Sequence, residues 1–207
     1  MSEPTADVID LLAGIERGSA LDRIRDRRPV ARENAQKSWA ALFEPEEPGT
    51  VSALERYAVV AFVAALHREP ETVRFYAEAL TGRDAGLAAA VVAEAERAGA
   101  EGPYGRYPEG PLSAEDRRGP VYHVSGEGRS VLGSRLAAAL EHTHLLVFRP
   151  RDAASADMKA LLAAGWSDTG IVTFSQLVAF LSFQVRVVTG LRVLGASLGT
   201  ASAAAGA

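Results

Sequence analysis

The feature that most constrains the fold is an apolar run that begins just after Ser52 and continues to Leu66. Ser52 followed three residues later by Glu55 is a capping-box pattern, which marks the first turn of a helix. The residues that follow are apolar nearly all round, so the run predicts a helix that is buried on most sides. Pro70 cannot continue a helical hydrogen-bond ladder, so this helix should end before it and a second should cover 71–80. The core is therefore expected to form around one central helix.

Caps and helix breakers predict further helices on both sides of this pair. Asp7 is placed to cap a helix and Gly18 to end it, while Pro29 occupies a first-turn position. No stretch alternates in the manner of a β-strand strongly enough to compete, which predicts an all-α fold, a helical bundle. The helices predicted outside the central pair cover 7–16, 22–28, 29–43, 84–98, 130–145, 157–164 and 174–194.

One long segment, 99–128, interrupts the helical pattern, because Gly and Pro recur in it and apolar anchors are few. We expect one helical turn over 113–116. The segment exceeds an ordinary loop, so it should lie across a neighbouring subunit or across the mouth of a cavity. The chain is accordingly divided into three parts: an N-terminal helical extension (1–49), a helical domain (50–195) and a flexible tail (196–207).

The absence of cysteine from all 207 residues removes several classes of chemistry. The chain can form no thiolate nucleophile, no disulfide and no cysteine-ligated metal site. Its net charge is −4 and its arginines are scattered, which does not resemble the basic surface of a nucleic-acid binder. The first residues are acidic, and we find no apolar run near the roughly 20 residues that span a bilayer. We therefore expect a cytoplasmic protein with neither a membrane nor a nucleic acid as partner.

Two segments resemble a known family. The central pair, Glu55 to Leu80, resembles the redox core of the alkylhydroperoxidase D-like (AhpD-like) and carboxymuconolactone decarboxylase (CMD) superfamily. The sequence Ala160-Leu-Leu-Ala-Ala-Gly-Trp-Ser-Asp-Thr-Gly-Ile-Val172 is similar to the family's closing segment, and Arg186 corresponds to an arginine of the helix that follows it. The resemblance implies an AhpD-like helical bundle and a cysteine-free CMD-domain protein.

The redox residues of that family are replaced here by other residue types. In an ungapped alignment its two cysteines fall on Glu69 and Thr72, the following histidine on Phe75, and the proton-relay glutamate of the peroxidase branch on Tyr57. Dithiol peroxidase chemistry is therefore excluded.

His67 and Glu69 lie at the break between the two central helices, where the superfamily places its chemistry. An imidazole beside a carboxylate can act as a general base, and the resemblance adds Tyr57 to this candidate catalytic set. The alternative is structural: a histidine that interacts with the dipole at a helix C-terminus, and a solvated glutamate.

The alignment also implies residues that would line a pocket at this break. They are Phe75, Tyr76, Gln184 and Arg186. Aromatic residues at such spacings more often belong to an ordinary core. Because Arg186 interrupts an apolar helix face, we expect a buried guanidinium paired with Glu55 or Glu69.

Two further patterns could bind ions. His142 and His144 suggest a metal site, but alternating histidines point about 200° apart on a helix, so a helix end is the more ordinary explanation and no metal is predicted. The glycine-rich helix start at 126–130 could present backbone N–H groups to an anion, although helix starts of this kind are common.

These observations support two functional hypotheses. The first is a non-peroxidatic CMD-domain protein that binds a small organic molecule or serves as a scaffold subunit, with a cysteine-containing AhpD-like paralogue as a further partner. The second is a thiol-independent acid/base enzyme of the decarboxylase or lactone/keto-acid type. It would use His67 as base, Glu69 as its orienting partner, and Tyr57 or Arg186 to stabilise an enolate or carboxylate. Neither implies a cofactor.

The resemblance also implies self-association. Two nearly all-round apolar helices exceed what a small helical monomer usually buries. We therefore expect a homo-oligomer whose interface includes the last long helix around Phe180, Phe183 and Val187.

Overall fold

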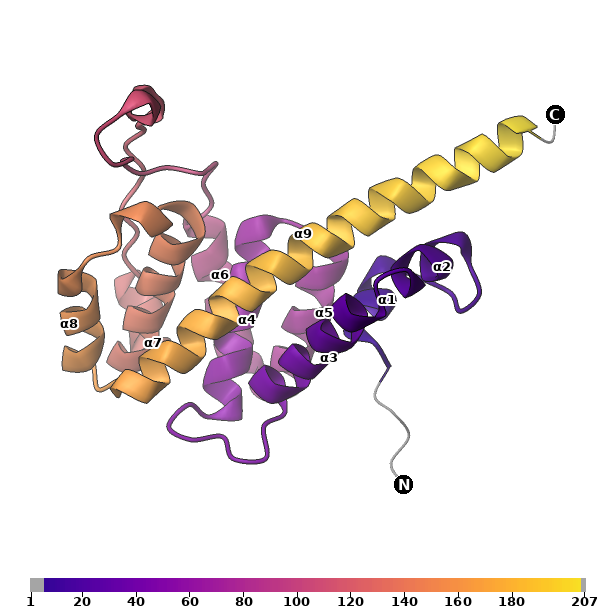
Figure 1. Ribbon diagram of the computed structural model, residues 1–207. Coiled ribbons are helices and arrows are strands. Elements are labelled where there is room, and N and C mark those ends of the chain that lie inside the picture. Colours follow the sequence, from indigo (N-terminus) through magenta and orange to yellow (C-terminus); the bar gives the residue numbers. More distant parts are fainter. Residues whose placement is uncertain (1–5, 206–207) are drawn as a thin grey trace. The chain divides into compact units, whose positions relative to one another are not determined.

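The computed structural model describes residues 6–205, and the chain there forms helices joined by turns and one long loop (Figure 1). The predicted all-α fold is confirmed, because within this range no strand forms and β-type pairing is limited to an isolated bridge between Gly105 and Arg117. The helices are α1 (Val8–Ala13), α2 (Ala20–Asp26), α3 (Pro29–Phe43), α4 (Ala53–His67), α5 (Pro70–Thr81), α6 (Ala85–Arg97), α7 (Gly126–Phe148), α8 (Ser155–Ala163) and α9 (Asp168–Ala205), with the 3₁₀ helices η1 (Pro111–Glu115) and η2 (Pro150–Asp152).

The chain divides into two compact units. Unit 1 consists of Met1–Glu46 and Phe183–Ala207, and unit 2 of Glu47–Ser182. The first division lies close to the predicted end of the N-terminal extension, whereas the second falls inside α9 rather than after residue 195. Helix α9 also continues to Ala205, where a flexible tail was predicted. Residues 1–5 of the predicted extension and 206–207 of the predicted tail lie outside the described residues.

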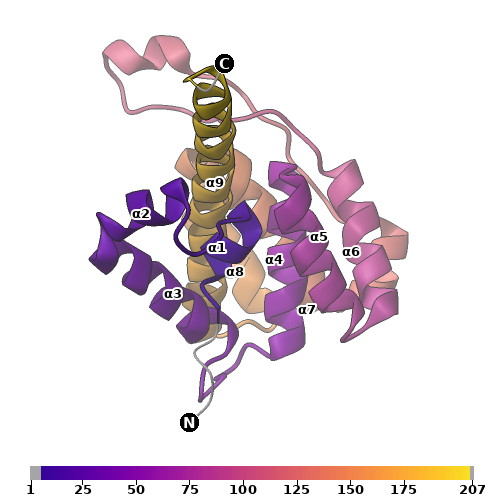
Figure 2. The same cartoon turned by 90° about the vertical axis from the view of Figure 1, so that its right-hand side faces the viewer.

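Helix α4 is the centre of unit 2, as its apolar run predicts. The capping box is present: Ser52 Oγ accepts a hydrogen bond from the Glu55 N–H (3.2 Å), and Glu55 Oε2 accepts one from the Ser52 N–H (2.8 Å). All but one of the residues from Arg56 to Leu66 are buried. They pack against α5, α6 and α7, and Figure 2 shows α4, α5 and α6 side by side.

Helix α7 is covered on opposite sides, by α4 and α6 on one side and by α8 on the other. It bends at Gly133, whose positive φ of 71° is readily adopted only by glycine. Phe174, near the start of α9, packs edge-on against His142, with ring centroids 5.7 Å apart. The long connection between α6 and α7 leads away from these helices, with η1 at its far end (Figure 1), and returns to α7. The single helical turn predicted over 113–116 corresponds to η1.

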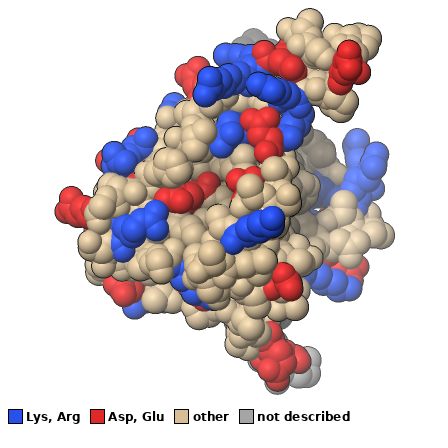
Figure 3. All heavy atoms as spheres, turned by 90° about the vertical axis from the view of Figure 1, so that its left-hand side faces the viewer, with Lys and Arg blue, Asp and Glu red and all other residues tan. Residues whose placement is uncertain are grey.

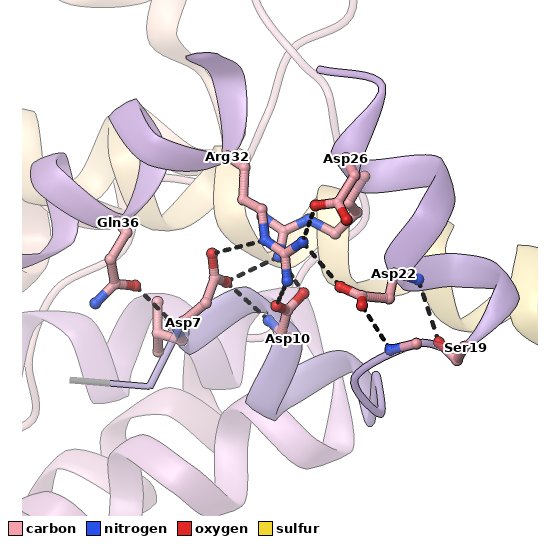
Figure 4. Close-up of polar contacts among 10 residues, drawn as sticks. Asp7, Asp10, Ser19, Asp22, Asp26, Arg32 and Gln36 are labelled. Atoms are coloured by element: carbon pink, nitrogen blue, oxygen red, sulfur yellow. Dashed lines mark hydrogen bonds and ion pairs between the residues drawn. The ribbon is translucent and has the colours of Figure 1, made fainter. Parts of the chain in front are cut away.

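Unit 1 contains α1, α2 and α3, whose mutual contacts include a dense charged cluster (Figure 4). The cluster consists of Asp7, Asp10, Asp22, Asp26, Arg25 and Arg32. Helix α1 ends at Gly14, which has a left-handed φ of 66°, and not at Gly18 as predicted. Gly18 instead forms the turn before α2, where its N–H donates to Asp22 Oδ2 (2.7 Å).

The stretch Asp168–Gly199 of α9 is long and apolar enough to cross a membrane, by length and composition alone. This stretch contradicts the expectation that no apolar run approaches the length of a membrane span. The core helix of a soluble protein passes the same test, so the finding is weak evidence for a membrane.

Candidate functional site

The predicted catalytic pair lies at the turn between α4 and α5. His67, the last residue of α4, is half-buried, and its Nε2 lies 3.1 Å from Oγ of Ser182 in α9. Glu69 is only 7% exposed, so the alternative prediction that it is a solvated glutamate is wrong. Its Oε2 accepts hydrogen bonds from the N–H (2.7 Å) and hydroxyl (2.6 Å) of Thr72. Glu69 is thus the N-cap of α5, a structural role that its position before Pro70 accounts for.

The aromatic residues of the predicted pocket make contacts typical of a packed core. Tyr57 is buried, and the guanidinium of Arg83 lies 3.6 Å from the centroid of its ring, a cation–π geometry. Tyr76 is fully buried and meets Phe75 edge-on at 5.0 Å.

A cavity of about 250 Å³ does lie beside this helix break, among α4, α5 and α6. Its lining is mostly small and apolar, with two charged residues. The lining residues are Ala61, Ala65, Arg68, Val73, Ala77, Val92, Ala95, Glu96 and Gly99. The predicted catalytic residues do not contribute to it.

The two remaining predicted pocket residues belong to the unit-1 part of α9. Gln184 is fully buried, whereas Arg186 is exposed, so the predicted buried guanidinium is wrong. Glu55, one of its two expected partners, pairs instead with Arg135, whose Nε lies 2.6 Å from Glu55 Oε1. Burial raises the pKa of Glu55, but this ion pair and the Ser52 hydrogen bonds hold it below the usual value.

A second cavity, of about 170 Å³, lies between α7, α8 and the end of the long connection, and we call it the α7–α8 cavity. Helix α7 contributes residues spaced three, four and seven apart, which lie on one helix face. The lining residues are Ala138, Glu141, His142, Leu145 and Arg149 from α7 and its cap, Asp157, Ala160 and Leu161 from α8, and Val121, Tyr122 and His123 from the connection. The connection thus borders a cavity, although not the one expected at the helix break.

His142 distinguishes this cavity from the first. Its side chain is buried (5% exposed), and neither ring nitrogen has a hydrogen-bond partner within the described part of the chain. Burial lowers the pKa of His142, while the charge of Asp157 acts in the opposite direction. The Nε of Arg149 is likewise buried without a partner, although Arg149 Nη1 lies 3.4 Å from Asp152 Oδ2. Two of the residues that line the cavity thus carry a buried hydrogen-bonding group without a partner.

His144 faces the other side of α7, as the spacing of the two histidines predicts. Its Nε2 lies 3.1 Å from the carbonyl oxygen of Ala98, and its ring packs against Tyr122 and Phe148. Both histidines lie inside α7 rather than at its end, so the expectation that they mark a helix end is wrong. Over residues 6–205 no group of three or more His, Asp or Glu side chains is arranged to hold a metal ion.

The glycine-rich start of α7 carries an anion of the protein's own. The carboxylate of Glu94, from α6, accepts hydrogen bonds from the N–H and hydroxyl of Ser125 and from the Tyr122 hydroxyl. Glu94 is only 2% exposed, and burial raises its pKa, but these hydrogen bonds hold it below the usual value. The predicted anion site is therefore filled by a side chain that no local motif indicates.

Sequence reasoning missed the α7–α8 cavity. His142 and Arg149 are seven residues apart, which places them on one helix face, but nothing in the local sequence shows that this face is covered.

On the molecular face that carries α8, acidic and basic side chains are interspersed (Figure 3).

Comparison with models of known protein families and with curated proteins gave no match. The family resemblance therefore rests on the sequence motifs alone and stays a hypothesis.

Proposed function

We propose that the protein is a thiol-independent, small-molecule-binding protein of the AhpD-like/CMD type, and that its ligand occupies the α7–α8 cavity. The observation that carries this proposal is the buried, unpartnered imidazole of His142 in the wall of that cavity.

A buried polar group without a partner costs about 1–3 kcal/mol of stability. An apolar side chain of similar shape at position 142 would avoid this cost, because the neighbours Leu145, Leu161 and Phe174 are apolar. Buried polar groups that remain unsatisfied are characteristic of functional sites. A ligand that forms a hydrogen bond with His142 would account for the presence of an imidazole at this position. Trapped water is the competing explanation.

The binding test compares the wild-type chain with His142→Phe. A library of small polar fragments is screened by the ¹⁵N resonances of the histidine side chains, which report hydrogen bonding at the ring nitrogens. We expect saturable shifts of the His142 signals in the wild-type chain with His67 unaffected, and ligand-observed NMR should show that the same fragments no longer bind the variant. Failure of every fragment to shift His142 would leave only water in the cavity and overturn the proposal.

The thiol-independent part is tested with an organic hydroperoxide and a dithiol-carrier reductant. Because the chain has no cysteine, turnover should not exceed that of buffer. Robust turnover would contradict the non-peroxidatic assignment.

The proposal includes self-association through α9. Phe183 is 48% exposed, an unusual position for a large aromatic side chain, while Phe180 and Val187 on the same helix are half-buried. We expect light scattering after size exclusion to give a mass well above 21.8 kDa. Phe183→Glu should shift it towards the monomer, and Leu162→Glu, at an exposed position of α8, should not. A monomeric wild-type chain would remove this part of the proposal.

A cytoplasmic location and a cysteine-containing AhpD-like paralogue as partner remain part of the proposal. A cytoplasmic location predicts that the full chain is recovered without detergent after cell fractionation. A requirement for detergent would instead favour a membrane role for α9.

A further inference from the structure

We infer that the ligand of the α7–α8 cavity is a small carboxylate, bound by Arg149 Nε–H and by the imidazole of His142. This inference rests on the proposed function and names the class of molecule that the cavity accepts.

The placement of these two groups supports this inference. His142 and Arg149 are seven residues apart, which is two helical turns, or about 10 Å along the axis of α7. Arg149 is the C-cap residue of α7, and its Nη1 lies 3.4 Å from Asp152 Oδ2, which leaves its Nε–H without an acceptor. Both residues line the same cavity, with Leu145 between them. The inference therefore places one molecule between these two residues.

The charged groups around the cavity favour an anionic ligand. The acidic groups of the cavity already have donors: Glu141 accepts from Arg129 (2.6 Å) and from the Val124 N–H (3.0 Å), its other oxygen lies 3.8 Å from His123 Nδ1, and Asp157 accepts from the Ala154 N–H (2.8 Å). The Tyr122 hydroxyl is directed to Glu94.

The buried Arg149 Nε–H, in contrast, is a cationic donor without an acceptor. A carboxylate oxygen is the acceptor that suits a guanidinium best, whereas a ligand cation would meet the charge of Arg149. The imidazole of His142 can then donate to the same carboxylate or bind an oxygen on the neighbouring carbon.

The fold also fixes the position of Arg149. Gly119 of the long connection lies against it so closely that a Cβ there would come within 2.6 Å of Arg149 Cδ and 2.7 Å of Tyr104 Cβ. Glycine at this position lets the connection pack onto the arginine stem. Gly119 is thus a positioning residue, and its replacement by alanine should displace the guanidinium.

The size of the cavity restricts the ligand further. At about 170 Å³ it is smaller than the roughly 300 Å³ or more of typical ligand pockets, so only a few heavy atoms fit. The probes are therefore acetate, glycolate, lactate and pyruvate, with acetamide and lactamide as neutral analogues of matched shape.

The experiment titrates these probes at millimolar concentrations into the wild-type chain and follows the His142 ring ¹⁵N signals and the Arg149 Nε–H signal. We expect at least one carboxylate to shift both signals saturably and its amide to bind about tenfold more weakly or worse. Arg149→Gln and Arg149→Lys should each weaken binding of the carboxylate by about tenfold or more, and Gly119→Ala should weaken its binding less. The matched control is Arg151→Gln, two residues along, whose guanidinium lies over the Tyr107 ring outside the cavity.

The outcomes separate the two proposals. If neutral fragments shift His142 and carboxylates bind no better, the carboxylate inference is wrong and the binding function stands. If no molecule shifts His142, both are wrong. If carboxylates shift His142 equally in the wild type and in Arg149→Gln, with the same melting temperature, the guanidinium is not the anchor and the inference fails.

Discussion

The carboxylate of Glu94 lies against the backbone of Gly128, in the first turn of α7, at a distance that leaves no room for a Cβ on that residue. Glu94 cannot move away freely, because Ser125 and Tyr122 donate hydrogen bonds to it. The buried carboxylate thus accepts hydrogen bonds from the residue that caps α7 and links α6 to α7. Residue 128 has to be glycine for this contact to exist.

Gly128→Ala is expected to destabilise the protein by about 1–3 kcal/mol, because the added methyl group forces Glu94 away from its donors. Gly126→Ala is the matched control: it lies two residues earlier in the same helix, and a Cβ there meets nothing within 4 Å. It should be neutral or stabilise by up to about 1 kcal/mol. Urea unfolding of both variants measures the difference. Equal effects would mean that Glu94 does not restrict residue 128.

The same contact shows what the sequence could predict. The bounds of α3, α4, α5 and α6 follow from local signals, namely Pro29, the Ser52 capping box, Pro70 and Asp84, because a cap or a proline acts within one helical turn. Glu94 acts on Ser125, 31 residues away, through a loop without periodicity. No local pattern records such a contact.

The site was missed for a related reason. A helix covered on one side shows an apolar stripe, but α7 is covered on opposite sides, so His142 and His144 are both buried although they point apart. The spacing of the two histidines predicts that they point apart, while the burial of both rings depends on α8, α9 and the long connection. The role of Glu69 as a cap was also open to sequence reasoning, since it stands directly before Pro70 and three residues before Thr72.

The buried His144 is expected to make stability fall as the pH is lowered from about 6.5 towards 4. Burial lowers the pKa of His144 to about 4 from an ordinary 6.5. Between these values the unfolded chain binds a proton that the folded chain does not, so the free energy of unfolding decreases by on the order of 3 kcal/mol over this range. The lowered pKa of His142 acts in the same direction. Urea unfolding at a series of pH values measures the slope.

A substitution shows whether His144 causes this pH dependence of the free energy of unfolding. His144→Phe should flatten the slope between pH 6.5 and 5. The carboxylates of the half-buried Glu55 and the buried Glu94, whose pKa values are held low, contribute only below about 4.5, so they do not obscure the histidine range. A slope that survives in His144→Phe would contradict the assignment.

His142→Phe is expected to stabilise the ligand-free protein, or at least not to destabilise it, even though it changes a buried position. The change removes an imidazole without hydrogen-bond partners and retains a ring that can pack edge-on against Phe174. A rise in melting temperature together with loss of ligand binding would be the stability–function exchange typical of binding sites. A loss of more than about 2 kcal/mol would indicate that His142 has a structural partner, such as buried water.

Arg32 is expected to be the most important charged residue of unit 1, because it contacts Asp7, Asp10, Asp22 and Asp26 from α1 and α2 (Figure 4). Its removal would leave Arg25 as the other arginine of the cluster, facing carboxylates that repel one another. Arg32→Met should therefore cost about 1–3 kcal/mol, and less at high salt. Lys37→Met, on the same helix, removes an exposed ion pair with Glu33 and should cost less than about 1 kcal/mol. Hydrogen exchange of the α1–α3 amides is the measurement, since the loss should be local to these helices, and equal protection in the two variants would refute the ranking.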